Sequence, residues 1–417
     1  MKMKRMLVTS AVLAVLLVSA TGSANADPMT PLFLGTAGVG TILGTGLDAA
    51  FGNPAQLGMT QSDGFHLRLV GIGAGIGNNS VGFAEYRKYN GADLNDMDKA
   101  AILSKVPSDG LRLRTDGGAS AMAVLIDGWS VHADAFAVGR GQFDRQIFEL
   151  LFYGNADQSN WNFTNTSGEG MAGGQIVLSH GGRLMQAFGH DLFGGFSASY
   201  IRGLYYAKSG ETQATLATQE GGLSGAGLAN WTTAEGGNGF GLDLGLAMPI
   251  GPRWTAGLKF EHVVNLVKWT RNVRDRQYEA HFDDLTVDNY DDSLVVTTET
   301  SRPGESFTRG LPPAIRAGVG RIGTSFSVAA EVAVALRDGL GVSTKPSVAT
   351  GLEYSPIHLL PLRLGASVGG ESGWSIGWGA GLRLGPVRLD TGMKIDQGVW
   401  VGSGRGMSGS LSLDLSL

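Results

Sequence analysis

The stretch Trp374–Leu384, with the sequence WSIGWGAGLRL, decides the fold class. Every second residue in it is apolar, and the residues between are serine, glycine or arginine. A period of two residues places one set of side chains on each face of a β-strand. The stretch therefore predicts a strand with one apolar face and one small or polar face.

The segments 361–371, 386–396 and 405–417 repeat this alternation. The last of them alternates leucine with serine or aspartate, as Leu411, Ser412, Leu413, Asp414, Leu415, Ser416 and Leu417. In a soluble sandwich the apolar face would form the core. In a transmembrane barrel that face meets lipid and the polar face lines the lumen. Glycines on the polar face, tryptophans on the apolar face and a secretion signal favour the barrel.

The secretion signal is predicted over residues 1–26. Three basic residues among the first five precede an uncharged run to Ala20, and small residues follow at positions 24–26. This is the layout of a cleaved signal peptide. A membrane anchor would need about 20 apolar residues. We therefore expect export through the inner membrane, a mature chain from Asp27 and a final location in the bacterial outer membrane.

The composition excludes several classes of protein. The formal net charge is −5, and loss of three basic residues with the signal makes it −8, so no nucleic-acid partner is expected. The chain has no cysteine, which excludes disulfides and thiolate metal sites. After the signal, no apolar run is long enough for a spanning helix, so the chain would enter a membrane as strands. Its 66 glycines are about twice the usual frequency of roughly 7 %.

The segment 27–62 contains no alternating run, and Asn53-Pro54 within it is a turn signal. Turn chemistry alone predicts a loop before the first strand. However, the small-residue stretch followed by DAAFGNPAQL at 48–57 resembles the start of the FadL-like outer-membrane family. That family comprises long-chain fatty-acid and aromatic-hydrocarbon transporters, with related barrels in type IX secretion. The resemblance implies 14 strands and an amino-terminal plug, whose motif here is Asp48, Asn53, Pro54, Ala55 and Leu57.

The rest of the chain, 63–417, is predicted to be one barrel. Alternation indicates fifteen strands, including one at 79–89, but bacterial barrels use even numbers, so we expect 14. Helical spacing predicts short inserts at 93–106 and 142–152. The segments 155–167, 221–239 and 269–309 are predicted as loops, the last with two short strand-like pieces that could form a protruding hairpin. Its aspartates could bind calcium, but they do not match a calcium loop, so we favour a solvated surface.

No catalytic or cofactor motif is present. The seven histidines show no metal-ligand spacing, and there is no Gly-x-Ser-x-Gly elbow. Ser179 with His180, and His190 with Asp191, are neighbours in sequence that a strand would point to opposite faces. The sequence therefore predicts neither an enzyme nor a cofactor.

Charged residues gather on the polar face of the carboxy-terminal strands. We expect an ion ladder across the lumen, because both signs alternate, whereas a substrate-carboxylate site would show an excess of basic residues. The predicted lumen-facing set is Arg363, Arg383, Arg388, Asp390, Lys394, Asp396 and Asp414.

These observations predict an all-β outer-membrane barrel of about 14 strands with an amino-terminal plug and short helical inserts. The first functional hypothesis is passive uptake of hydrophobic small molecules such as fatty acids. The alternative is a barrel that anchors, or forms a subunit of, a secretion or assembly machine. Expected partners are outer-membrane lipid and lipopolysaccharide, a hydrophobic ligand and secretion-machine subunits. Arginine at Leu413 should destabilise the barrel if that face meets lipid. Arginine at Ser412 should cost much less unless packing against the plug is tight.

Overall fold

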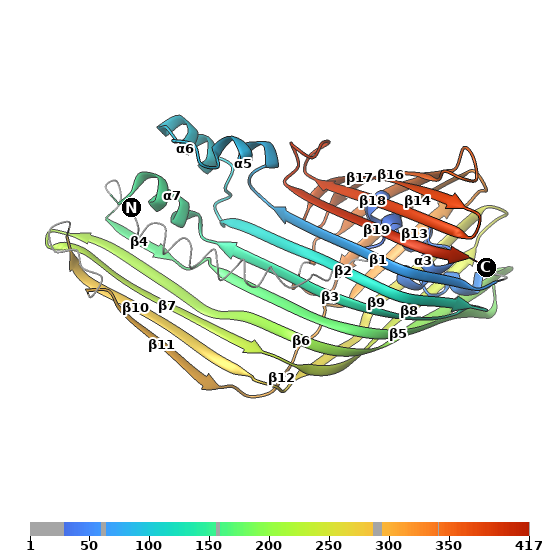
Figure 1. The fold of residues 1–417 in the computed structure, drawn as a ribbon, viewed down its shortest axis with the longest axis horizontal. Coiled ribbons are helices and arrows are strands. Elements are labelled where there is room, and N and C mark those ends of the chain that lie inside the picture. The colour runs from blue at the N-terminus through green and yellow to red at the C-terminus, as the bar shows by residue number, and fades with distance from the viewer. Residues whose placement is uncertain (1–28, 60–63, 156–158, 287–293, 341, 417) are drawn as a thin grey trace.

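The computed structural model describes residues 29–59, 64–155, 159–286, 294–340 and 342–416. Its central feature is a closed antiparallel β-barrel (Figure 1). The strands of the barrel wall are β1 (His66–Asn78), β2 (Leu111–Ile126), β3 (Trp129–Phe143), β5 (Ser167–Ala187), β6 (His190–Gln219), β8 (Gly237–Pro249), β9 (Trp254–Trp269), β13 (Ala314–Arg321), β14 (Phe326–Ala335), β15 (Ser347–Tyr354), β16 (Leu362–Gly369), β17 (Gly373–Leu384), β18 (Val387–Asp396) and β19 (Gly406–Ser416).

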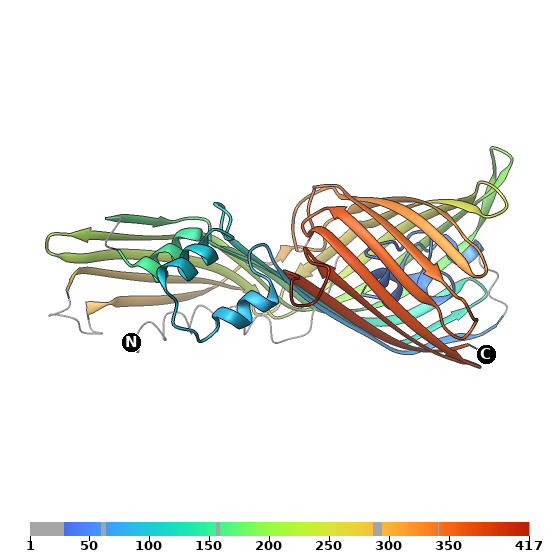
Figure 2. The same ribbon diagram turned by 90° about the horizontal axis from the view of Figure 1, so that it is seen from above.

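Each strand of this wall pairs with the next, and β19 pairs with β1 to close the circle. The closing register places Val70 opposite Leu413 and Ile76 opposite Met407. Fourteen strands therefore form the wall, which confirms the predicted strand number and fold class. The view from above shows the barrel as the wider part of an elongated molecule (Figure 2).

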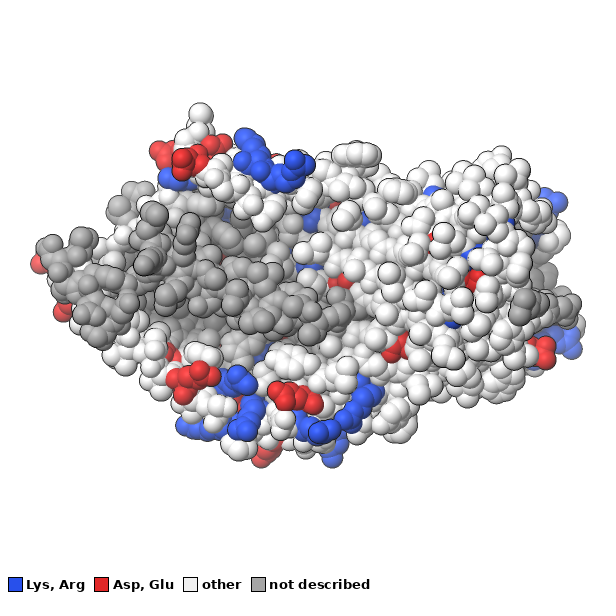
Figure 3. Space-filling view, in the orientation of Figure 1, with Lys and Arg blue, Asp and Glu red and all other residues white. Residues whose placement is uncertain are grey.

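The alternating pattern divides the wall into two faces. On β17, Ser375 and Gly377 face inward and are buried, whereas Trp374 and Trp378 are exposed on the outer face. On the face of the molecule seen in Figure 3, the outer surface of the barrel carries few charged residues. The outer face therefore has the apolar character that a lipid-facing wall needs.

The last strand follows the same division. Leu411 is exposed on the outer face, and Ser412 faces inward; Leu417 lies outside the described residues. Ser412 is only 1 % exposed. The inner face is therefore packed at this point, which is the exception to the low cost expected for arginine at Ser412.

The strands are joined by short turns at one end of the barrel, here called the turn end. Asp127-Gly128 and Phe188-Gly189 make two-residue hairpins in which both residues have positive φ. Such turns match the twist of paired strands and favour glycine at the second position. The opposite end carries all the long connections and is called the extension end.

A second sheet continues the wall beyond the extension end. β6 has 30 residues, which is roughly 100 Å of strand, and its far half leaves the barrel. There it pairs with β4 (Asn160–Phe163) and β7 (Gly222–Ala234). β7 in turn pairs with β10 (Arg274–Leu285), and β10 pairs with β11 (Val296–Pro303). A short strand, β12 (Phe307–Thr308), pairs with β9. Most of the three segments predicted as loops is thus paired strand, and the protruding hairpin is β10 with β11.

Three short helices also stand at the extension end (Figure 1). α5 (Phe83–Tyr89) replaces the strand predicted at 79–89, because Glu85 accepts a hydrogen bond from the Gly82 amide and caps a helix. α6 (Asp96–Leu103) and α7 (Arg145–Tyr153) correspond to the two predicted helical inserts. No helix among the described residues is long and apolar enough to cross a membrane.

The segment 29–59 lies inside the barrel as three short helices joined by turns (Figures 1 and 2). α2 (Pro31–Gly35) packs on β16 to β19, α3 (Leu47–Phe51) on β1 and β2, and α4 (Gln56–Met59) on β5, β6 and β8. This segment, called the inner segment below, therefore touches both sides of the wall and determines what space is left in the lumen.

Candidate functional site

The inner segment packs backbone to backbone on the wall. A Cβ atom on Gly365 would lie 2.2 Å from the carbonyl carbon of Thr36, and one on Gly377 would lie 2.2 Å from the Leu34 carbonyl oxygen. On the opposite side, a Cβ on Gly195 would lie 2.4 Å from the Pro54 carbonyl carbon. Real side chains do not approach so closely. The absence of side chains at these inward-facing glycines therefore allows the inner segment to pack directly on the backbone of the wall.

Replacing Gly365 by alanine should consequently displace the inner segment. We expect the free energy of unfolding to fall by about 1–3 kcal/mol, the usual cost of overpacking. The matched control is Gly409→Ala on β19, where a Cβ would meet no atom within 4 Å and the change should stay within about 0.5 kcal/mol. Urea unfolding in lipid vesicles, followed by tryptophan fluorescence, measures both. Equal stability of the two variants would contradict the close packing described here.

Polar contacts fix the first half of the inner segment. Thr30 caps α2 by accepting a hydrogen bond from the Phe33 amide at 3.3 Å. After α2, the Gly40 and Thr41 amides donate to the Glu331 carboxylate of β14 at 3.0 and 2.8 Å. Glu331 also binds Arg316, whose guanidinium reaches Glu261 at 3.0 Å. One wall carboxylate thus holds the inner-segment backbone and the neighbouring strands together.

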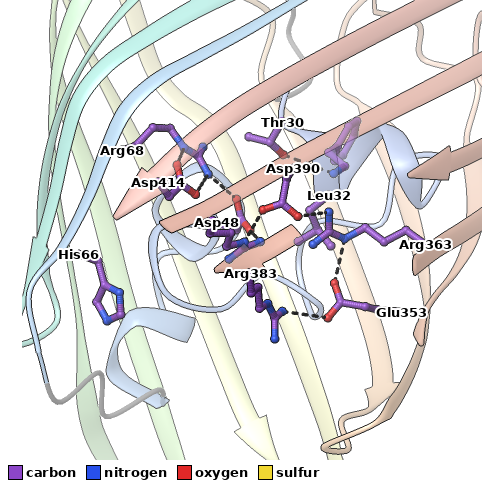
Figure 4. A network of polar contacts seen from close by, with 12 residues as sticks. Thr30, Leu32, Asp48, His66, Arg68, Glu353, Arg363, Arg383, Asp390 and Asp414 are labelled. Carbon is purple, nitrogen blue, oxygen red and sulfur yellow. Dashed lines mark hydrogen bonds and ion pairs between the residues drawn. The ribbon is translucent and has the colours of Figure 1, made fainter. Parts of the chain in front are cut away.

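Asp48 links the inner segment to the seam where the first and last strands meet (Figure 4). Its carboxylate accepts hydrogen bonds from Arg68 of β1 at 2.9 Å and from Arg388 of β18 at 2.9 Å. Arg68 also donates to Asp414 of β19 at 2.7 and 3.0 Å. Arg68 is 1 % exposed and Asp48 is 6 % exposed. Asp48 therefore joins β1 to β18 directly, and Arg68 extends the link to β19.

The same network continues along the carboxy-terminal strands. Arg388 and Arg363 both bind Asp390, the latter at 2.7 Å. Arg363 then binds Glu353 at 2.8 Å, and Arg383 approaches Glu353 at 3.9 Å. The network contains four arginines, Arg68, Arg363, Arg383 and Arg388, and four carboxylates, Asp48, Glu353, Asp390 and Asp414. It is therefore neutral as a whole, which suits a structural ion network.

The other two predicted lumen charges lie apart from this network. Lys394 and Asp396 are at the extension end of β18, where Asp396 binds Arg114 of β2 at 2.8 Å and accepts a hydrogen bond from Ser375 at 2.7 Å. Lys394 approaches Asp396 at 3.9 Å. A cavity of about 110 Å³ lies between these groups and the inner segment. Its lining includes Phe33, Ala37, Arg114, Arg316, Glu331 and Lys394.

The remaining residues of the 48–57 motif hold the second half of the inner segment. Asn53 is fully buried, donates to the Leu246 carbonyl of β8 at 3.0 Å and accepts from the Ala55 amide at 3.1 Å. The Pro54 carbonyl lies against Gly195 of β6, as described above. Ala55 and Leu57 are buried, and Leu57 packs in a cluster with Leu125. Each motif residue therefore fixes the inner segment to the wall rather than lining open space.

An aromatic cluster lies toward the extension end of the barrel. The rings of Tyr206 and Trp269 are 5.4 Å apart between centroids, and Phe307 lies 5.2 Å from Tyr206. The Tyr206 hydroxyl donates to Glu169 at 2.8 Å, and Arg309 binds the same carboxylate at 2.6 Å. The buried members of the cluster, called the aromatic cluster below, are Val138, Met171, Ile201, Tyr206, Ala234, Val267, Trp269, Val273, Leu311 and Leu340.

The serine and histidine that are neighbours in sequence do not act together in the structure. His180 stacks on Trp129 at 4.0 Å, whereas Ser179 is buried and hydrogen-bonded to Ser197 at 2.8 Å, so the two neighbours do not form a dyad. Within the described ranges, no three His, Asp or Glu side chains are grouped so that they could hold a metal ion. What the lumen offers is an apolar cluster, a charged cavity and a firmly held inner segment.

Several important residues were not singled out from the sequence. Arg68 lies on β1 beside a register shift, so alternation did not place it with the carboxy-terminal charges. Glu353 and Glu331 are single acids within apolar strands, a pattern that could have signalled inward-facing partners. The aromatic cluster joins residues from β3, β5, β6, β7 and β9 with residues of three connections, and nothing in the sequence pattern brings those together.

The fold of this barrel is similar to that of several solved outer-membrane transporter structures. The Ralstonia pickettii toluene transporter TbuX is 13 % identical, with 94 % of this chain and 99 % of that chain covered and a TM-score of 0.56. The Pseudomonas putida toluene transporter TodX is 13 % identical, with 94 % of this chain and 99 % of that chain covered and a TM-score of 0.55. A Pseudomonas aeruginosa FadL homologue is 13 % identical, with 95 % of this chain and 99 % of that chain covered and a TM-score of 0.50. At such identities the likeness shows the fold.

The sequence itself assigns the chain more narrowly. It belongs to a family of unknown function, DUF5723, whose model matches residues 58–393. No curated protein matches the chain.

Proposed function

We propose that this protein is an outer-membrane barrel for the passive uptake of hydrophobic small molecules, exported by a cleaved signal peptide over residues 1–26. The observation that carries the proposal is a FadL-like barrel with an aromatic cluster at the extension end of its lumen. A ligand site of this kind is mostly apolar with a few placed polar groups, and Glu169 and Arg309 at the cluster meet that description. The resemblance to toluene transporters and a FadL homologue supports the same class of cargo.

The direct test is uptake by cells that express the full chain. Cells lacking their own hydrophobic-compound barrels should accumulate radiolabelled toluene or oleate faster when the protein is present. Mass spectrometry of molecules extracted from the purified barrel should recover an apolar ligand. Uptake that equals that of cells with an empty vector, for every apolar compound tried, would exclude this function.

The orientation is a separate prediction. Long connections of outer-membrane barrels lie outside and short turns face the periplasm. We therefore expect the extension end to face the exterior, so that protease added to intact cells cleaves within Thr270–Arg309. Immunoblotting of the fragments detects the cut. Cleavage that requires permeabilised cells would reverse the orientation.

A second candidate is a barrel that anchors or assembles a secretion machine. The observation that favours it is the sheet of β6, β7, β10 and β11 beyond the barrel, together with exposed apolar side chains on α5 and α6 such as Tyr86 and Met97, which are 56 and 80 % exposed. Apolar patches of this kind often mark contact surfaces. Affinity purification from native membranes would yield a stoichiometric partner and no bound apolar molecule if this candidate holds.

A further inference from the structure

The connection between β14 and β15 turns inward at the extension end. Gly339 and Val342 exchange backbone hydrogen bonds of 3.2 and 3.0 Å on either side of Leu340 and residue 341, the second of which lies outside the described residues. The tips of strand connections usually lie at the surface. Leu340 is nevertheless 0 % exposed and forms part of the aromatic cluster. The tip of this connection therefore reaches into the cluster instead of into solvent.

The backbone of this tip is strained. Leu340 has φ of +41°, a left-handed conformation that bulky residues rarely adopt and that turns normally give to glycine or asparagine. Such strain persists only where the surroundings impose it, and it is concentrated at ligand clamps and switches. Asp338 holds the base of the turn by accepting a hydrogen bond from the Thr344 amide at 2.8 Å. The Leu340 side chain is thus buried although its backbone has to adopt an unfavourable left-handed conformation.

Residues of the same connection contact both the aromatic cluster and the cavity. Leu340 is part of the cluster. Val342, Ser343 and Lys345, which follow in the chain, line the cavity that reaches Phe33 and Ala37 of the inner segment. Movement of Leu340 out of the cluster would therefore free apolar volume near the lining of the cavity.

We propose that the Leu340 side chain occupies an apolar ligand site and leaves it when an uncharged apolar molecule binds. The inference rests on the proposed uptake function and names both the class of molecule and the residue it displaces. The molecule is uncharged because the cation beside the cluster, Arg309, is already neutralised by Glu169 at 2.6 Å. A carboxylate would have to compete with Glu169, whereas a hydrocarbon needs only the space and the ring faces that Leu340 occupies.

The absence of cysteine from the chain makes a direct test available. Leu340→Cys introduces a single thiol, and its reaction rate with a water-soluble maleimide reports exposure of that position. In the purified full-length barrel we expect the Leu340→Cys thiol to react slowly when no ligand is added. Toluene should make the reaction at least tenfold faster, and dodecanoate should leave the rate unchanged. Two matched controls are Leu336→Cys, at a position 59 % exposed on the same connection, and Val39→Cys, at a position 0 % exposed in the inner segment. The first should label quickly and the second slowly under all conditions.

The other outcomes each overturn the inference. A rate at position 340 that does not respond to toluene shows that the leucine stays in place. Faster labelling at both 340 and 39 shows general loosening, and an equal response to dodecanoate removes the restriction to uncharged molecules.

Toluene uptake by cells tests the same inference if the Leu340→Cys variant does not fold. Leu340→Ala should take up toluene at least threefold faster than wild type in cells, and Leu340→Trp should take it up more slowly. Equal uptake by all three contradicts the role of Leu340 while leaving the uptake function intact. Toluene-dependent labelling without any toluene uptake by the wild-type protein would instead contradict the uptake function, while still supporting Leu340 as the occupant of a binding site.

Discussion

Replacing Asp48 by alanine is expected to lower the free energy of unfolding by about 3 kcal/mol, the lower end of the range for removing one partner of a buried ion pair. Asp48 binds Arg68 and Arg388, and each arginine keeps one other partner, Asp414 or Asp390. The network would then hold four arginines and three carboxylates, so an uncompensated charge would remain buried beside the barrel seam. Asp48→Asn, which preserves the shape, should cost less.

The matched control removes an aspartate from an exposed pair. Asp191 binds Arg183 at 3.1 Å, and their side chains are 36 and 61 % exposed. Asp191→Ala should therefore change stability by no more than about 1 kcal/mol. Urea unfolding in vesicles gives both values, and limited proteolysis shows whether the inner segment has come loose. A loss for Asp48→Ala no greater than for Asp191→Ala would mean that the network does not hold the seam.

Arginine at Leu411 should cost about 2–4 kcal/mol, because this position lies halfway along β19 on the outer face and is 43 % exposed. An arginine there would place its charge near the centre of the bilayer. Met407, also on the outer face and 39 % exposed, lies at the extension end of the same strand. Met407→Arg should therefore cost only about 0–1 kcal/mol, as expected near an interface.

Heat-modifiable gel mobility after membrane extraction shows which variant folds, and urea unfolding quantifies the difference. The comparison depends on depth alone, since both positions share a strand and a face. Equal costs would show that this face does not meet the bilayer at the expected depth. A wild-type protein that is soluble without detergent would rule out the lipid-facing assignment altogether.

The sequence was most informative where one face of a strand differs in chemistry from the other. In Trp374–Leu384, tryptophan against glycine defines both the strand and its orientation, and the structure places them accordingly. The alternation was uninformative for Gly222–Ala234, where small and polar residues occupy both faces. That segment is a strand because β6 and β10 pair with it, and its own residues show little preference.

The candidate site was less accessible to prediction, for a different reason. The motif at 48–57 could be identified by resemblance, but its partners could not, because Asp48 meets Arg388 at a separation of 340 residues. Periodicity concerns near neighbours, and it cannot tell which of many inward-facing charges will be adjacent across a lumen. The turn that buries Leu340 was equally hidden, since its sequence has the appearance of an ordinary surface connection.

The contact of Arg68 with Asp414 has a consequence for the order of folding. These residues are 346 positions apart, so bringing them together closes almost the whole chain into a loop, at a high entropic cost. Asp48 is only 20 positions before Arg68, so their pairing requires a much shorter loop. We therefore expect the Asp48–Arg68 pair to form early, before β19 joins the wall. The seam is then completed by the arrival of β19, which makes Asp414 a marker of a fully assembled wall.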